Sequence, residues 1–224
     1  MAQAGIHGMV GLAFQKVFPK REWLVFGLVL GNLFPDADNL AVAVATVMKL
    51  PTDGLHRTFT HSLFTVLFLF GVFYLVGKLT KQSRWINFGM GFSLGVLLHI
   101  LLDLVVWFNG VELLWPLPGW VNFWEGVSPK IWFEKLMLPL EFLFFALFFF
   151  FLERLQAKME KPPVKWLKFW IIVQSGLFIL FTFLVNFIDQ AFMTIYGLVY
   201  LLSLGLAWGV TIKMRALFDR PVKT

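Results

Sequence analysis

The sequence contains no cysteine, which excludes disulfide bonds and thiolate metal sites. Charged residues are also scarce: they make up 14% of the 224 residues, against about 25% in ordinary soluble domains. Hydrophobic residues make up 59%, and they include 28 phenylalanines and 10 tryptophans. A water-soluble core of this size could not bury so much apolar surface, whereas lipid can accept it. The composition therefore predicts an integral membrane protein.

Seven apolar runs predict an all-α, polytopic membrane helical bundle of six or seven membrane segments, in a single integral membrane domain over residues 1–224. The last five approach the roughly 20 residues that cross a bilayer, whereas the first two are shorter and indicate a hairpin with a basic tip. A further apolar helix near 40–48 is too short to span and is expected to be re-entrant or interfacial. The seven runs lie near 5–18, 23–34, 63–77, 86–108, 136–152, 166–188 and 191–212.

The distribution of lysine and arginine predicts the orientation of these segments. With the N-terminus outside and the segments alternating, fifteen of the 19 basic residues fall on the cytoplasmic side and four on the other. This is the bias of the positive-inside rule. It accounts for the net charge of +6 without a nucleic-acid partner, and it places the basic loop at 154–168 beside anionic lipid. We therefore expect a bacterial-type inner membrane protein.

The connection from Asn109 to Glu134 is rich in tryptophan. Indole rings favour the headgroup zone of a bilayer, so this segment is expected to lie on the outer membrane surface. Two interpretations stay open: an ordinary aromatic belt, or a lipid-facing rim over a site.

All four histidines fall at the outer ends of their segments in this topology, and three aspartates follow the same pattern. His99 and Asp103 are four residues apart, so they share one face of a helix. Ionisable side chains at membrane depth are costly and usually functional, which favours metal ligation over a simple His–Asp hydrogen bond. The other candidates for a common site are His7, His56, His61, Asp36 and Asp38.

Two short segments supply most of those candidates. In GLHRTFTHS, His56 and His61 accompany Arg57, whose guanidinium suits a phosphate or carboxylate but could instead bind lipid headgroups. In GNLFPDADNL, either Asp36 or Asp38 could cap the helix that follows. Two neighbouring carboxylates beside histidines would also repel each other, and a cation would remove that conflict.

Two glutamates are weaker candidates. Glu134, at the start of the segment near 136–152, could be a ligand or a general base, although a carboxylate at a helix start is also favoured by the helix dipole. Glu141 has no motif around it.

Together these motifs resemble the membrane-bound metal-dependent hydrolase family typified by YdjM. The resemblance covers roughly residues 5–120 and rests on His7 in an apolar helix, LFPDADNL, HRTFTHSL, LLHILLDL and ELLWP. It implies a multi-span fold, a bound divalent metal and hydrolase chemistry, with the metal site in residues 1–120 and additional helices in 121–224. The HxxxD pairing is also similar to one in zinc-dependent phospholipase C proteins, which suggests a phosphoester. Carried over to this chain, the ligands would be His7, Asp36, Asp38, His56, His61, His99 and Asp103, with Glu134 as a looser match.

The leading interpretation is a metal-dependent hydrolase acting on a phospholipid or lipid-linked phosphoester at the non-cytoplasmic face. Zn²⁺ is the first choice for nitrogen and oxygen ligands, as one or two ions, with Mn²⁺ or Fe²⁺ as alternatives. The candidate catalytic residues are Asp36, Arg57 and Glu134. The alternative is a metal-ion or proton transporter that uses the same cluster, which would need polar groups continuing toward the cytoplasm. A haem-binding bundle and a structural scaffold are weaker interpretations.

Overall fold

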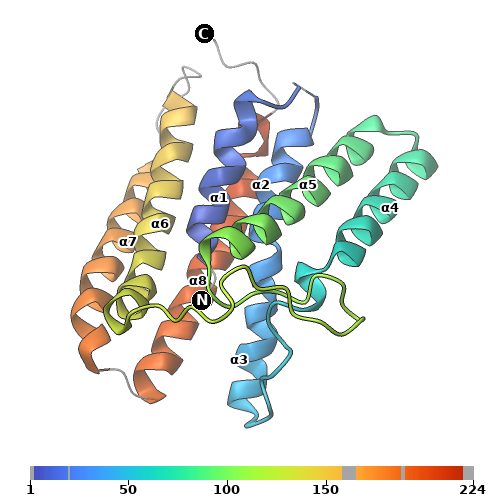
Figure 1. The fold of residues 1–224 in the computed structure, drawn as a ribbon. Coiled ribbons are helices and arrows are strands. Elements are labelled where there is room, and N and C mark those ends of the chain that lie inside the picture. Colours follow the sequence, from blue (N-terminus) through green and yellow to red (C-terminus); the bar gives the residue numbers. More distant parts are fainter. Residues whose placement is uncertain (1–2, 20, 158–164, 188–189, 219–224) are drawn as a thin grey trace.

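The computed structural model describes residues 3–19, 21–157, 165–187 and 190–218. Eight α-helices within these residues form a bundle, and the long loop 107–130 runs across one end of it (Figure 1). The only β pairing among them is an isolated bridge between Val111 and Val121. The helices are α1 (Ala4–Ala13), α2 (Leu24–Leu33), α3 (Asn39–Val47), α4 (Leu63–Thr80), α5 (Ser83–Val106), α6 (Ile131–Ala157), α7 (Lys165–Leu184) and α8 (Gln190–Lys213).

The predicted all-α, polytopic membrane bundle is confirmed. The five helices α4 to α8 are long and apolar enough to cross a membrane. A sixth candidate span consists of α2 and α3, which are separated by the short 3-10 helix η2 (Pro35–Asp38) and bent by 40°. The predicted short helix near 40–48 is therefore α3. With ten residues, α1 is about 15 Å long and does not reach across a bilayer by itself.

Helix α2 lies at the centre of the fold, and all ten of its residues are buried. Glycines let its backbone touch that of α5: a Cβ on Gly31 would overlap the carbonyl of Phe92, and one on Gly91 would overlap the carbonyl of Leu24. Small residues are the usual means by which membrane helices pack at backbone contact. This packing fixes the end of α2, and the turn η2 after it, beside the second half of α5.

Helix α1 packs against α2 and α6 in the same manner. A Cβ on Gly5 would overlap the backbone of Phe144 in α6. The amide of Gly5 donates a hydrogen bond of 3.2 Å to the buried carboxylate of Glu141, and the Gln3 side chain donates one of 2.7 Å to the carbonyl of Met137. These contacts set the position of His7, which lies in the first half of α1.

Helices after residue 121 pack against the N-terminal half of the chain. The indole N–H of Trp208 in α8 lies 3.4 Å from the carbonyl oxygen of Leu33 at the end of α2, and α1 is packed on α6. The single-domain assignment, with a metal-site half and additional helices, stays a prediction. The orientation in the membrane also stays a prediction, and residues 158–164 of the basic loop lie outside the described residues.

The tryptophan-rich loop has two kinds of indole. Trp115, Trp120 and Trp124 are exposed, as a segment at a membrane surface requires. Trp107 is only 5% exposed and belongs to the packed interior. The exposed indoles, with that of Trp132 in α6, therefore belong to the predicted segment from Asn109 to Glu134, and the buried Trp107 precedes it.

Candidate metal centre

Five completely buried side chains from four separate segments meet inside the bundle. Helix α1 and the 3-10 turns η2 and η3 (Phe59–His61) contribute one each, and α5 contributes two. The glycine-mediated packing of α1, α2 and α5 is what brings these segments together. The five residues, which we call the inner cluster, are His7, Asp36, His61, His99 and Asp103.

The polar atoms of the inner cluster lie close enough to share a cation. The Nε2 atoms of His61 and His99 are 3.2 Å apart. Asp103 Oδ2 lies 3.4 Å from His61 Nε2 and 3.8 Å from His99 Nε2. His7 Nε2 is 3.2 Å from Asp103 Oδ1, and the His7 ring stacks on that of His99 with 3.6 Å between centroids. Asp36 Oδ1 is 3.9 Å from His99 Nε2.

Hydrogen bonds on the far side of two rings determine which nitrogen faces the cluster. His99 Nδ1 lies 2.7 Å from the carbonyl oxygen of Asn32, which can only accept, so Nδ1 carries the proton. His61 Nδ1 lies 3.0 Å from the Thr60 hydroxyl, which itself donates to Asp38 at 2.7 Å. His61 therefore also donates from Nδ1. Each Nε2 atom is left with a lone pair, and the two lone pairs face each other.

Two facing lone pairs need a proton or a metal ion between them. Burial lowers the pKa of His61, but hydrogen bonds to Asp103 and Asp38 and their negative charges outweigh this and raise the pKa overall. The negative charges of Asp38 and Asp103 thus favour a positive charge at His61. Zinc–nitrogen bonds of about 2.0–2.1 Å in a tetrahedral site put two nitrogens roughly 3.3–3.4 Å apart. The observed 3.2 Å between the two Nε2 atoms is close to that spacing.

The candidate ligand atoms fall into two overlapping sets of three, and within each set all atoms lie within 4.8 Å of one another. One set is His7, His99 and Asp103, and the other is Asp36, His61 and His99. The Nε2 atom of His99 has one lone pair, so it can bind one ion at a time. The geometry thus fits one ion directly, and a second ion would have to bind without His99.

Several atoms of the inner cluster have no hydrogen-bond partner. By hydrogen-bond geometry these are both carboxylate oxygens of Asp36, both of Asp103, and both ring nitrogens of His7. Asp103 still has the Arg57 guanidinium at 3.4 Å to compensate its charge, whereas Asp36 has no lysine or arginine beside it among the described ion pairs. An uncompensated buried carboxylate costs several kcal/mol, so buried polar atoms without partners require a specific explanation such as an ion. Imidazole nitrogens and two carboxylates, with no sulfur, form a donor set that suits a divalent metal. The buried His/Asp residues could therefore hold a metal ion.

Asp38 lies one layer further out and is well supplied with donors. Its carboxylate accepts from the Thr60 hydroxyl at 2.7 Å and from the Arg57 amide at 3.1 Å, and it lies 2.6 Å from His56 Nδ1. It makes no side-chain cap to α3, so simple helix capping does not explain it. A carboxylate behind a histidine commonly orients that histidine toward a metal. We call Asp38, His56 and Thr60 the outer layer, and its two titratable members belong to neither ligand set.

Arg57 is buried beside the inner cluster, at 3% exposure, which rules out the interpretation as a headgroup-binding surface arginine. Its backbone is left-handed, with φ of 64°, a costly conformation that persists where the surroundings enforce it. The guanidinium donates to the carbonyl of Gly110 at 3.2 Å and lies 3.4 Å from Asp103 Oδ2. The atom nearest Asp103 is Nη2, and the Nε atom has no acceptor.

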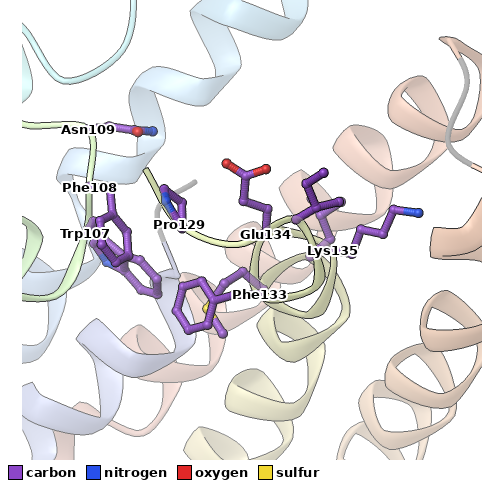
Figure 2. Close-up of a pocket in the computed structure, with 10 residues that line it drawn as sticks. Trp107, Phe108, Asn109, Pro129, Phe133, Glu134 and Lys135 are labelled. Carbon is purple, nitrogen blue, oxygen red and sulfur yellow. The ribbon is translucent and has the colours of Figure 1, made fainter. Parts of the chain in front are cut away.

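Glu134 is the predicted site residue that lies apart from the others. It is exposed in the first turn of α6 and lines a separate pocket, which Figure 2 shows with Trp107, Phe108 and Phe133 on its walls. It belongs to neither ligand set. A role as a metal ligand or general base therefore has no support from its position.

Two partners of the inner cluster, and the burial of Glu141, had not been predicted. The Asn32 carbonyl fixes His99, but a backbone group carries no sequence signal. The Thr60 hydroxyl links His61 to Asp38, and threonine is too common to stand out. Glu141 of α6 is fully buried and accepts a hydrogen bond from the amide of Gly5, at the start of α1. A lone acidic residue within a span could have been recognised from the sequence.

Comparison with known proteins gives one match. No curated protein and no solved structure matches the chain. A family model described as YdjM inner membrane protein matches residues 1–193, well beyond the 5–120 of the predicted resemblance, and it includes the inner cluster, Arg57 and the outer layer. The chain therefore belongs to the YdjM inner membrane protein family and is an integral inner membrane protein with a buried His/Asp centre able to hold a metal ion.

Proposed function

We propose that the chain is a metal-dependent hydrolase and that the inner cluster binds its divalent ion, with Zn²⁺ favoured over Mn²⁺ or Fe²⁺. The observation that carries this proposal is the pair of lone-pair-bearing Nε2 atoms 3.2 Å apart, beside carboxylate oxygens that have no partner. When bound, such an ion supplies Lewis acidity, which lowers the pKa of water toward neutral.

The chain's own residues would supply proton transfer and anion binding. Asp36 has two carboxylate oxygens without partners and can accept the proton of an attacking water. Arg57 presents an Nε without an acceptor, and its guanidinium, already beside Asp103, can hold negative charge that develops on a phosphoryl oxygen. The Asn32 carbonyl and Asp38 keep the two imidazoles in position.

The favoured substrate is a phospholipid or a lipid-linked phosphoester at the non-cytoplasmic face. Support for a phosphoester comes from the buried arginine beside the candidate metal ligands. Support for a lipid comes from the position of the centre among helices that lie in a membrane. The side of the membrane follows from the positive-inside bias, and no nucleic-acid partner is expected.

A transporter that uses the same residues has less support. A conduction path would need polar groups that continue through the bundle. From Leu24 to Leu33, the central helix α2 carries one polar side chain, that of Asn32. At its contact with α5, glycines of each helix pack at backbone distance against mainly apolar residues of the other, such as Leu24, Leu28 and Phe92.

The test is the metal content of the purified protein, measured by mass spectrometry for the wild type, His99→Ala and His61→Ala. We expect about one ion per chain in the wild type and a large loss in both variants, because each removes a nitrogen ligand. Ser203→Ala, a buried change in α8, serves as the control and should keep its metal. Unchanged metal content in both histidine variants would contradict the proposal. Metal-loaded protein is then assayed for hydrolysis of phospholipids in bilayer nanodiscs.

A further inference from the structure

We propose that the pocket shown in Figure 2, between the end of α5 and the start of α6, binds the hydrocarbon chain of the substrate. This inference rests on the proposed function and assigns a place to the apolar part of a lipid phosphoester. The pocket has a volume of about 380 Å³. That lies within the roughly 300–1,000 Å³ typical of small-molecule sites.

The first connection between the pocket and the inner cluster runs along α5. His99 and Asp103 share one face of α5, and Trp107 directly follows the last residue of that helix. The amide of Trp107 donates to the carbonyl of Asp103 at 3.1 Å. His99 and Asp103 belong to the inner cluster, and Trp107 lines the pocket. The pocket wall therefore begins one helical turn from a candidate metal ligand.

Two further connections arrive from other segments. Gln3 precedes His7 by one turn, and its side chain donates at 2.7 Å to the carbonyl of Met137, another lining residue. Arg57 donates at 3.2 Å to the carbonyl of Gly110, which directly follows a lining residue. Contacts from α5, from the residue before α1 and from Arg57 thus link the surroundings of the inner cluster to the pocket wall. The pocket and the inner cluster are therefore held by the same segments of the chain.

The chemistry of the pocket suits a hydrocarbon chain. Trp107 and Leu138 are buried, and the rings of Phe108 and Phe133 meet edge to face at 5.9 Å. The charged groups of Glu134 and Lys135 diverge from these rings in Figure 2. A sugar or a nucleobase would leave polar groups without partners against such walls, whereas an alkyl chain would not. We therefore assign Glu134 to the pocket and not to catalysis.

The experiment compares two phosphomonoesters with and without a long chain, dodecyl phosphate and ethyl phosphate, titrated into zinc-loaded protein in detergent. Met137→Trp places a larger side chain on the pocket wall, and Leu136→Trp is the matched control because Leu136 does not line the pocket. We expect the wild type and Leu136→Trp to bind dodecyl phosphate at least about tenfold more tightly than Met137→Trp does, since each buried methylene contributes roughly fourfold. Ethyl phosphate should bind all three proteins equally, which also shows that the variants are folded.

The outcomes separate the pocket from the metal chemistry. Equal dodecyl phosphate affinity for wild type and Met137→Trp would overturn the pocket. If ethyl phosphate does not bind zinc-loaded wild type, the proposed function fails instead. In that case dodecyl phosphate is titrated into zinc-free protein, which tests the pocket by itself. A lower affinity in Met137→Trp alone would support the pocket as the chain-binding site, and equal affinity in all three proteins would contradict it. Partition into detergent micelles is the same for all three proteins and cancels.

Discussion

The inner cluster and the outer layer contain the same residue types but differ in what their atoms contact. Asp36 and Asp38 lie two residues apart in one 3-10 turn. The Asp38 carboxylate is contacted by the Thr60 hydroxyl, the Arg57 amide and His56. Asp36 is completely buried, yet neither of its carboxylate oxygens has a hydrogen-bond partner. The protein therefore supplies hydrogen-bond donors to the Asp38 carboxylate and none to that of Asp36.

This difference distinguishes residues that bind a metal ion from residues that hold the metal ligands in position. A buried carboxylate without partners destabilises the metal-free protein, and binding of a metal ion to that carboxylate removes the destabilisation. A carboxylate with several donors stabilises the fold in either state and fixes the ring it contacts. The inner cluster is therefore assigned to metal binding and the outer layer to its orientation, and substitutions should distinguish the two.

The largest difference is expected in zinc affinity between Asp36→Asn and Asp38→Asn. Asp36→Asn removes a charged candidate ligand, so the dissociation constant should rise by at least about 100-fold, above the 10–100-fold usual for groups that only orient ligands. Asp38→Asn should fall inside that smaller range. Competition with a zinc chelator measures both constants. Equal effects, or a larger effect of Asp38→Asn, would contradict the division into two layers.

The same two substitutions should change the stability of metal-free protein in opposite directions. Asp36→Asn removes a buried carboxyl group that has no hydrogen-bond partner and should raise the free energy of unfolding, whereas Asp38→Asn weakens three hydrogen bonds and should lower it. The magnitude is about 1–3 kcal/mol in each case. Thermal unfolding with EDTA in detergent measures the two Tm values, with Glu134→Gln on the exposed first turn of α6 as the control. Shifts of the same sign would show that Asp36 is paired in solution.

The third comparison concerns the contact between α2 and α5, which positions the 3-10 turn that carries Asp36 and Asp38. Gly91→Ala places a methyl group against the carbonyl of Leu24 and should destabilise the protein by about 1–3 kcal/mol. It should also weaken zinc binding several-fold, because α2 positions Asp36 and the Asn32 carbonyl. Gly71→Ala is the matched control, since nothing lies within 4 Å of its added methyl. A Tm and zinc affinity equal in both variants would show that the α2–α5 contact does not set the site.

The fold was largely predictable because apolar length is a strong signal in membrane helices. Helices α4 to α8 follow from their hydropathy, and α3 follows from its short apolar run after PDADN. The backbone contact between α2 and α5 could not be predicted, because the glycines that permit it show only that some close approach exists. Which helix approaches is decided by the whole bundle.

The site was predictable in composition but not in its layers. The four-residue spacing of His99 and Asp103 placed both on one face, and the structure keeps them together. The sequence could not separate Asp36 from Asp38, since side-chain direction in a 3-10 turn depends on the donors around it. Those donors, such as the Arg57 amide, come from a segment about 20 residues away. Glu134 was included for its charge and its place near the same end of the bundle.

The smallest effect on zinc affinity is expected for His56, which the sequence motif predicted as a ligand and the structure places in the outer layer. His56→Ala removes one of the contacts to Asp38, so zinc affinity should fall by about tenfold, the lower limit for groups that orient ligands. His61→Ala removes a ring whose Nε2 faces His99 and should reduce affinity far more. Chelator competition on both variants measures the ratio. His56 is partly exposed, so its removal should leave the interior folded, and the Tm of His56→Ala checks this before a loss equal to that of His61→Ala is assigned to the metal. Such a loss would make His56 a ligand, as its motif first suggested, and would place the metal one layer further out.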